Sequence, residues 1–226
     1  MTLLFDLDGT LTDSCVGIGR CINHALVALG RPAAPEPRLR SMVGAPLSRI
    51  FTTLLASADA TLIDRAIAAY RERFDTVGIF ENQVYPGVAE ALREFQGDGH
   101  SLHVVTTKPT LAAGRVLEHF GLAAYFLSVH GTALTDRGCD KAALVREALD
   151  AAPDGAAAVM VGDRAEDIRA AHAHGARAIA ALWGYGTRAE LEAAMPDRLA
   201  ENLGDLMAWV RASHLPAARR TADGPR

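Results

Sequence analysis

Short apolar runs recur along the chain, and each of them stops at or next to a polar residue or a glycine. Because these runs do not alternate between apolar and polar positions, they are typical of strands buried on both faces of a parallel sheet. Four runs of this kind predict strands: 3–5, 102–105, 158–161 and 178–182.

Helical patterns fill the intervals between these runs. The segment 86–97 begins at Pro86 and places Val88, Leu92 and Phe95 on one face, as an amphipathic helix does. Strands that alternate with helices indicate the α/β class, here a doubly wound, Rossmann-like parallel sheet. Similar patterns predict three more helices: 109–121, 140–149 and 165–173.

One long segment, 15–82, breaks this alternation because its pattern is helical only. We expect it to form a separate all-helical bundle, a cap domain inserted after the first strand. Two apolar stripes carry this expectation: Ile18, Ile22, Ala25, Leu26 and Leu29, then Leu62, Ile63, Ala66, Ile67, Tyr70 and Phe74. The predicted division is a core of 1–13 and 84–213, a cap of 14–83 and a tail of 214–226.

Two aspartates follow the first predicted strand directly. Asp6 and Asp8 belong to the string Asp-Leu-Asp-Gly-Thr-Leu, and ligands of open parallel sheets bind beyond the carboxyl ends of the strands. We expect both carboxylates to point to the same side, where they repel unless a cation lies between them or one is protonated. An ordinary turn after a strand is the plainer interpretation, but it leaves so specific a string unexplained.

A second acidic pair follows the third predicted strand. Asp163 comes directly after Gly162, and Asp167 lies about one helical turn later. Taken alone, the pair is explained equally well without a metal, as a helix cap followed by a solvated side chain. Beside Asp6 and Asp8 it completes a set of carboxylate oxygens that suits Mg²⁺.

Lysine is scarce in this sequence. Of the 23 Lys and Arg residues, only Lys108 and Lys141 are lysines, so both are candidates for work that needs a compact ammonium group. Lys141 falls in the first turn of a predicted helix, where the helix dipole disfavours a cation unless a bound anion offsets it. Thr106, at the end of the second strand, offers a hydroxyl and a backbone amide to the same edge of the sheet.

Composition narrows the class of protein. A formal net charge of −4 argues against a nucleic-acid binder, and no apolar run approaches the ~18 residues of a membrane span. An acidic residue, Asp6, occurs close to the N-terminus, so we expect no secretory signal.

Three cysteines, Cys15, Cys21 and Cys139, fit a reducing cytoplasm without structural disulfides. Cys139 lies near Lys141 without a base to activate it and is expected to be inert.

These motifs, in this order, resemble the four motifs of the haloacid-dehalogenase-like hydrolases. Asp6 with Asp8 matches the first motif, Thr106 the second, Lys141 the third, and Asp163 with Asp167 the fourth. The segment between the first strand and Tyr85 resembles the helical cap of the family. Three further segments resemble its phosphoglycolate-phosphatase-like branch: 44–47, 78–82 and 183–186.

The resemblance implies a Mg²⁺-dependent phosphatase that forms an aspartyl-phosphate. Asp6 is then the nucleophile, and Asp8 protonates the leaving alcohol and later activates water. Thr106 and Lys141 bind the phosphoryl oxygens. The implied metal ligands are the carboxylate of Asp6, the backbone carbonyl of Asp8, and Asp163, with Asp167 holding metal waters or orienting Lys141.

The substrate is expected to be a small phosphorylated metabolite, bound by a monomer or a homodimer. Substrate contacts are expected from Thr107, which departs from the Asn or Ser common at its place, and from Lys108. On the cap, the candidates for substrate contacts are Arg20, His24 and Arg49, although residues of these types more often lie on a solvated surface and contact no substrate.

Some alternatives stay open and others are excluded. A nucleotidase, a sugar-phosphate phosphatase and a sugar phosphomutase share these motifs; a phospho-accepting receiver domain and a silent binding module fit less well. The dehalogenase branch lacks an equivalent of Asp8, and the phosphonate-cleaving branch needs a cap lysine that 15–82 does not contain.

Overall fold

The core of the protein is a six-stranded sheet in which every neighbouring pair is parallel. The structure is a computed structural model that describes residues 1–133, 140–152 and 157–214. In space the strands follow the order β5-β4-β1-β6-β7-β8, so the order reverses at the central strand β1. The strands are β1 (Thr2–Phe5), β4 (Ser101–Pro109), β5 (Ser128–Thr132), β6 (Ala158–Gly162), β7 (Arg177–Ala181) and β8 (Arg198–Ala200).

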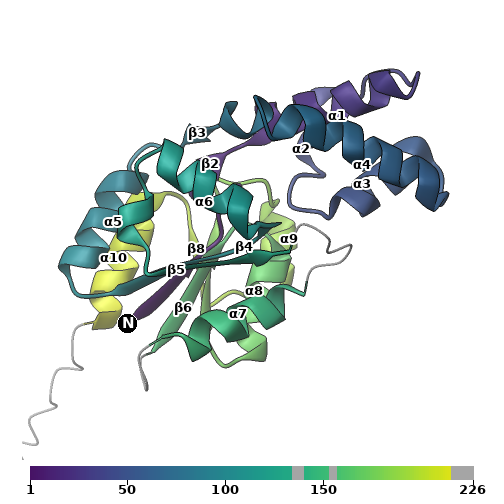
Figure 1. The fold of residues 1–226 in the computed structure, drawn as a ribbon. Coiled ribbons are helices and arrows are strands. Elements are labelled where there is room, and N and C mark those ends of the chain that lie inside the picture. Colours follow the sequence, from purple (N-terminus) through teal and green to yellow (C-terminus); the bar gives the residue numbers. More distant parts are fainter. Residues whose placement is uncertain (134–139, 153–156, 215–226) are drawn as a thin grey trace, which may run out of the picture.

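Helices cover both faces of this sheet (Figure 1). Side chains alternate between the faces: Leu3 and Phe5 join one hydrophobic cluster, and Leu4 joins the other. The first face carries α5 (Val88–Gly97), α6 (Thr110–His119) and α10 (Leu203–His214). The second carries α7 (Lys141–Asp150), α8 (Ala165–Ala173) and α9 (Arg188–Ala193). The predicted doubly wound α/β fold is therefore confirmed.

A helical layer stands apart from the sheet, at the end where β2 and β3 lie (Figure 1). It contains α1 (Cys15–Ala28), α2 (Glu36–Arg40), α3 (Leu47–Leu55), α4 (Ala60–Phe74) and the short 3₁₀ helix η1 (Gly78–Phe80). The chain enters through β2 (Thr12–Asp13) and returns through β3 (Gln83–Val84), which pair antiparallel. We propose this two-stranded ribbon as the boundary between core and cap.

The two outer strands, β5 and β8, were missed by the sequence pattern. Both lie at the edges of the sheet, and all five residues of β5 are only partly buried. An edge strand needs no continuous apolar run, so its sequence lacks the signal that marked the inner strands. Most of the predicted tail, 215–226, and Cys139 lie outside the described residues. No described helix is both long and apolar enough to cross a membrane.

Two helical glycines give a matched test of the packing in the cap. A methyl group on Gly17 of α1 would overlap backbone oxygens of Gly78 and Glu81, whereas one on Gly114 of α6 would meet no atom within 4 Å. We expect Gly17→Ala to lower the free energy of unfolding by about 1–3 kcal/mol. Gly114→Ala should raise it by roughly 0.5–1 kcal/mol. Thermal unfolding checks both, and equal effects of the two changes would contradict the close approach of α1 and η1.

Candidate active site

The reversal of strand order brings the acidic motifs together. Asp6 follows β1, Thr106 lies near the end of β4 and Asp163 follows β6, and these are three adjacent strands. Because the strands are parallel, their carboxyl ends open on one edge of the sheet, the usual place for a ligand in this architecture.

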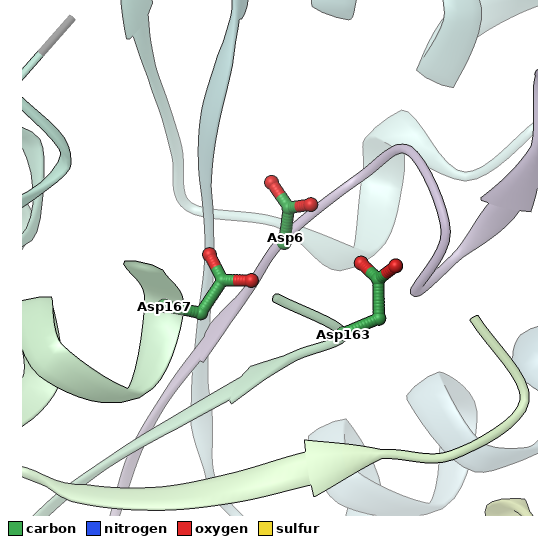
Figure 2. A group of neighbouring side chains, drawn as sticks. All are labelled: Asp6, Asp163 and Asp167. Atoms are coloured by element: carbon green, nitrogen blue, oxygen red, sulfur yellow. The ribbon is translucent and has the colours of Figure 1, made fainter. Parts of the chain in front are cut away.

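Three carboxylates converge at this edge. Oxygen atoms of Asp6, Asp163 and Asp167 lie within 4.8 Å of one another, and all three residues are buried. Figure 2 shows Asp6 and Asp163 extending from strand ends and Asp167 from a helix, with their carboxylates turned toward a common space. Asp167 lies in the first turn of α8, where the helix dipole favours an anion.

Lys141 supplies the positive charge next to this group. Its ammonium Nζ donates to Asp6 Oδ1 at 2.7 Å and lies 2.8 Å from Asp167 Oδ1. The side chain of Lys141 is 7% exposed. Lys141 begins α7, and the two carboxylates offset the unfavourable position of a cation at a helix N-terminus. The predicted partner anions are therefore carboxylates of the protein itself.

Burial sets the ionisation of the group. Burial raises the pKa of Asp6 to about 6, even though Lys141 favours the charged form. Burial and the nearby carboxylates of Asp6 and Asp167 hold the pKa of Asp163 well above its ordinary value. Burial acts to lower the pKa of Lys141, but the charges of Asp167 and Asp6 outweigh it and raise that pKa.

The charge balance of this group fits a divalent cation. Three ionised carboxylates and one ammonium leave two negative charges in a buried space, which costs free energy unless a cation offsets them. Carboxylate oxygens are the ligands that Mg²⁺ prefers. The residues present therefore fit the predicted magnesium ion.

Neutral groups fix the orientation of the acids. Asp163 accepts hydrogen bonds from the Thr10 hydroxyl at 3.2 Å and from the backbone N–H of Tyr185 at 2.7 Å. Asp167 Oδ2 accepts from the backbone N–H of Arg164 at 3.0 Å. The loop after β7 also holds the first motif, because the Trp183 indole donates to the carbonyl of Thr10 at 3.0 Å. Sequence reasoning had left the role of this loop open.

Glycines allow the acids to pack closely, a role that sequence reasoning missed. A side chain on Gly9 or Gly184 would overlap Asp163, and one on Gly162 would overlap Asp167. Gly9 also adopts a positive φ of 96°, which favours glycine. Gly9 and Gly162 lie next to motif aspartates in the sequence, whereas Gly184 does not.

Asp8 has a partner of its own, although its charge still acts on the nearby carboxyl of Asp6. Its carboxylate pairs with the ammonium of Lys108 and is not part of the three-carboxylate group. Lys108 Nζ also lies 5.3 Å from the ring centre of Phe74 on α4, so the pair forms where core and cap meet. The other oxygen, Asp8 Oδ1, is buried and has no hydrogen-bond partner among the described residues.

The two threonines after β4's apolar run differ in their surroundings. Thr106 is buried, and its hydroxyl accepts from the backbone N–H of Lys108 at 3.2 Å. Thr107 is partly exposed, and its hydroxyl lies 3.5 Å from the carbonyl oxygen of Gly44 on the cap. Thr107 thus contacts both the core and the cap.

Two cavities flank the acidic group, and each contains a different part of the first motif. The Lys141 cavity has a volume of about 760 Å³ and contains Asp6, Lys141 and Asp167. The Asp8 chamber has a volume of about 410 Å³ and contains Asp8 and Lys108. Residues 44–46 of the cap and Thr107 border both, so the two cavities adjoin there.

The cap candidates separate in space. Arg49 lines the Lys141 cavity. Arg20 lines neither cavity, and its guanidinium donates to Glu81 Oε1 at 2.7 Å. His24 is exposed on α1 and also lines neither cavity. Spacing along α1 placed Arg20 and His24 on one helix but did not determine which way that helix faces.

Comparison with known proteins agrees with this geometry. The family described as haloacid dehalogenase-like hydrolase matches residues 3–181. The crystal structure of a predicted phosphatase from Clostridium acetobutylicum has a TM-score of 0.86 at 32% identity, covering 93% of this chain and 98% of that one.

Curated relatives carry several different names. A 5'-nucleotidase from Pseudomonas aeruginosa is 36% identical, over 90% of this chain and 92% of its own. The tyrosine-protein kinase PtkA of Mycobacterium tuberculosis is 35% identical, over 89% of this chain and 72% of its own. A phosphoglycolate phosphatase from Vibrio parahaemolyticus is 31% identical, over 93% of this chain and 96% of its own. The predicted resemblance to this family and to its phosphoglycolate-phosphatase-like branch is confirmed.

The buried charge leads to a prediction about stability. We expect Asp163→Asn to raise the free energy of unfolding of the metal-free protein by on the order of 1 kcal/mol, because it removes a carboxylate whose ionised form is disfavoured. We also expect Mg²⁺ to raise the melting temperature of the parent protein, and the same change should abolish that rise. Asp150→Asn, at an exposed position on α7, is the control and should change neither. A lower melting temperature of metal-free Asp163→Asn would contradict the prediction.

The pKa of Asp6 leads to a prediction about pH. Metal binding requires an ionised carboxylate, so protons compete with Mg²⁺ below the pKa of about 6. We expect the Kd for Mg²⁺, measured by calorimetry, to rise by at least about tenfold per unit as the pH falls below 6, because Asp163, whose pKa is also raised, takes up protons in competition with the metal as well. Without metal, the raised pKa means that Asp6 destabilises the fold as the pH rises from about 4 to about 6. A Kd that does not vary between pH 5 and 8 would contradict this ionisation.

Proposed function

Because the chain belongs to the haloacid dehalogenase-like hydrolase family, we propose that it is a Mg²⁺-dependent phosphatase that hydrolyses a small phosphomonoester through an aspartyl-phosphate. One observation carries the proposal: three buried carboxylates share a single lysine at the edge of the sheet. A structural role alone does not explain a buried group with excess negative charge.

Asp6 is the nucleophile in this proposal. Its carboxylate attacks phosphorus, the bond to the ester oxygen breaks, and the phosphoryl group becomes attached to Asp6. Lys141, 2.7 Å from Asp6 Oδ1, is placed to bind phosphoryl oxygens beside it and to lower the repulsion between two anions. Thr106, which is buried at the same edge, binds a further phosphoryl oxygen.

Asp8 moves the protons. It donates a proton to the leaving alcohol and then takes one from the water that hydrolyses the aspartyl-phosphate. The support for this role is that Asp8 Oδ1 is buried and has no hydrogen-bond partner among the described residues. Lys108 holds the other oxygen of the same carboxylate and thereby orients it.

Asp6, Asp163 and the backbone carbonyl of Asp8 would hold the magnesium ion, and Asp167 its waters. The ion, when bound, neutralises phosphoryl oxygens and so favours attack by an anion. The donor set and its charge support this assignment.

The substrate in this proposal is a small phosphorylated metabolite in the cytoplasm, with Thr107, Lys108 and Arg49 as contacts. The buried thiols of Cys15 and Cys21, both free, support a reducing compartment. Relatives named phosphoglycolate phosphatase and 5'-nucleotidase give two substrate classes to compare. Sugar phosphates remain a further alternative for both hydrolysis and a mutase reaction.

A phosphate-release assay tests the proposal. We expect Mg²⁺-dependent release from at least one of phosphoglycolate, nucleoside monophosphates, ribose phosphates and glucose 1-phosphate. Asp6→Asn should lower kcat by about 10³-fold or more, because it removes the nucleophile. Asp75→Asn, on the cap beyond α4, is the control and should keep full activity.

Other outcomes separate the alternatives. No release from any ester, with Asp6→Asn indistinguishable from the parent protein, would contradict the proposal. An isomeric product formed only with a bisphosphate primer would favour a mutase. Phosphate transferred from a nucleoside triphosphate to a tyrosine peptide, without hydrolysis of any ester, would favour a kinase.

A further inference from the structure

The division of the first motif between two cavities shows where the alcohol part of the substrate lies. In an in-line displacement at phosphorus, the leaving oxygen lies opposite the nucleophile, and the group that protonates it lies beside that oxygen. Asp8 lines the Asp8 chamber and not the Lys141 cavity, whereas Asp6 lines only the Lys141 cavity. The alcohol therefore occupies the Asp8 chamber. This step rests on the proposed function.

The cap gives this chamber apolar walls. Ile18 comes from α1, Leu47 from α3, and Ile67, Tyr70 and Phe74 from α4. The rings of Tyr70 and Phe74 stack with their centres 5.3 Å apart, and both residues are less than a tenth exposed. These walls suit an aliphatic or aromatic group, because burial of apolar surface is favourable.

The charged groups of the chamber are already engaged. Lys108 pairs with Asp8, and Asp64 and Arg71 each have an interaction partner. Among the described residues that line the chamber, each cation therefore already has an interaction partner. A carboxylate placed there would lose hydration and would have to compete with these partners for a counter-charge, which is unfavourable.

The size of the chamber also favours an alcohol larger than glycolate. Its volume of about 410 Å³ lies within the range of ~300–1,000 Å³ that holds drug-sized ligands. The two-carbon acid of phosphoglycolate leaves most of such a space without protein contacts, whereas a ring with a substituent fills much more of it.

We propose that the Asp8 chamber selects phosphomonoesters of neutral alcohols with an aliphatic or aromatic face, and discriminates against esters of short hydroxy acids such as phosphoglycolate. Residues Leu47, Ile67 and Tyr70 of the cap determine this specificity. The Lys141 cavity takes the phosphoryl end of the same ester.

A pair of esters tests the preference in the parent protein. Benzyl phosphate and phosphoglycolate both release a primary alcohol, and they differ in the apolar ring of one and the carboxylate of the other. We expect kcat/KM for benzyl phosphate to exceed that for phosphoglycolate by at least tenfold, with Mg²⁺ present. Acetyl phosphate, whose leaving group is small, reports on the chemistry independently of the chamber.

A lysine introduced into the wall of the chamber tests whether the alcohol binds there. Ile67→Lys adds a cation to the wall, and Ala68→Lys adds the same charge at the next, exposed position of α4. We expect Ile67→Lys to shift the ratio of kcat/KM values toward phosphoglycolate by at least tenfold, and Ala68→Lys to leave it unchanged. Leu47→Lys, entering from α3, gives the same test if circular dichroism shows that Ile67→Lys does not fold.

The outcomes separate the two proposals. A parent protein that prefers phosphoglycolate, or lysine variants with the same ratio at 67 and 68, would overturn the assignment of the chamber while the phosphatase function stands. Absence of Mg²⁺-dependent release from these three compounds and from the nucleoside and sugar phosphates of the assay above would overturn the phosphatase function and the inference that rests on it.

Discussion

The crowding of three buried carboxylates around one lysine is the constraint on which the rest of the structure depends. Asp6, Asp163 and Asp167 lie within 4.8 Å of one another, and Lys141 contacts two of them. Such a group is costly in a protein interior because the carboxylates repel and lose hydration. The fold must hold it in place, and its excess negative charge makes the site receptive to a divalent cation.

The sheet provides this rigidity. The acids follow β1 and β6 at the centre of six parallel strands, and helices that bury both faces pack these strands in place. Backbone N–H groups of Tyr185 and Arg164 donate to Asp163 and Asp167, and Gly162 and Gly184 leave room for the two side chains. Stability is therefore concentrated in the apolar layers, while the edge of the sheet keeps a group that the interior alone would disfavour.

Core and cap contribute different parts of the candidate site. The core supplies the acids and the lysine, to which the proposed function assigns the phosphoryl transfer. The cap supplies most of the apolar wall of the Asp8 chamber and the strip 44–46 where the two cavities adjoin. A change in the cap can therefore alter the alcohol that fits without disturbing the charged group. The ion pair of Lys108 and Asp8, with Phe74 of the cap beside it, is where the two parts meet.

The sequence by itself determined the inner strands, four of the six helices that cover the sheet (α5, α6, α7 and α8) and the acids at the strand ends. Apolar periodicity and the positions of Asp6 and Asp163 after their strands are local features, so the pattern along the sequence was enough to predict them. It did not reveal the edge strands β5 and β8, because edge strands need no continuous apolar run. The direction of Asp8 toward Lys108, the exclusion of Arg20 and His24 from the cavities, and the apolar chamber were decided only by the tertiary structure. The last two depend on how the cap docks on the core, whereas the pair of Asp8 and Lys108 joins two core segments that lie 100 residues apart in the sequence. In each case residues far apart in sequence meet through packing that no local pattern encodes.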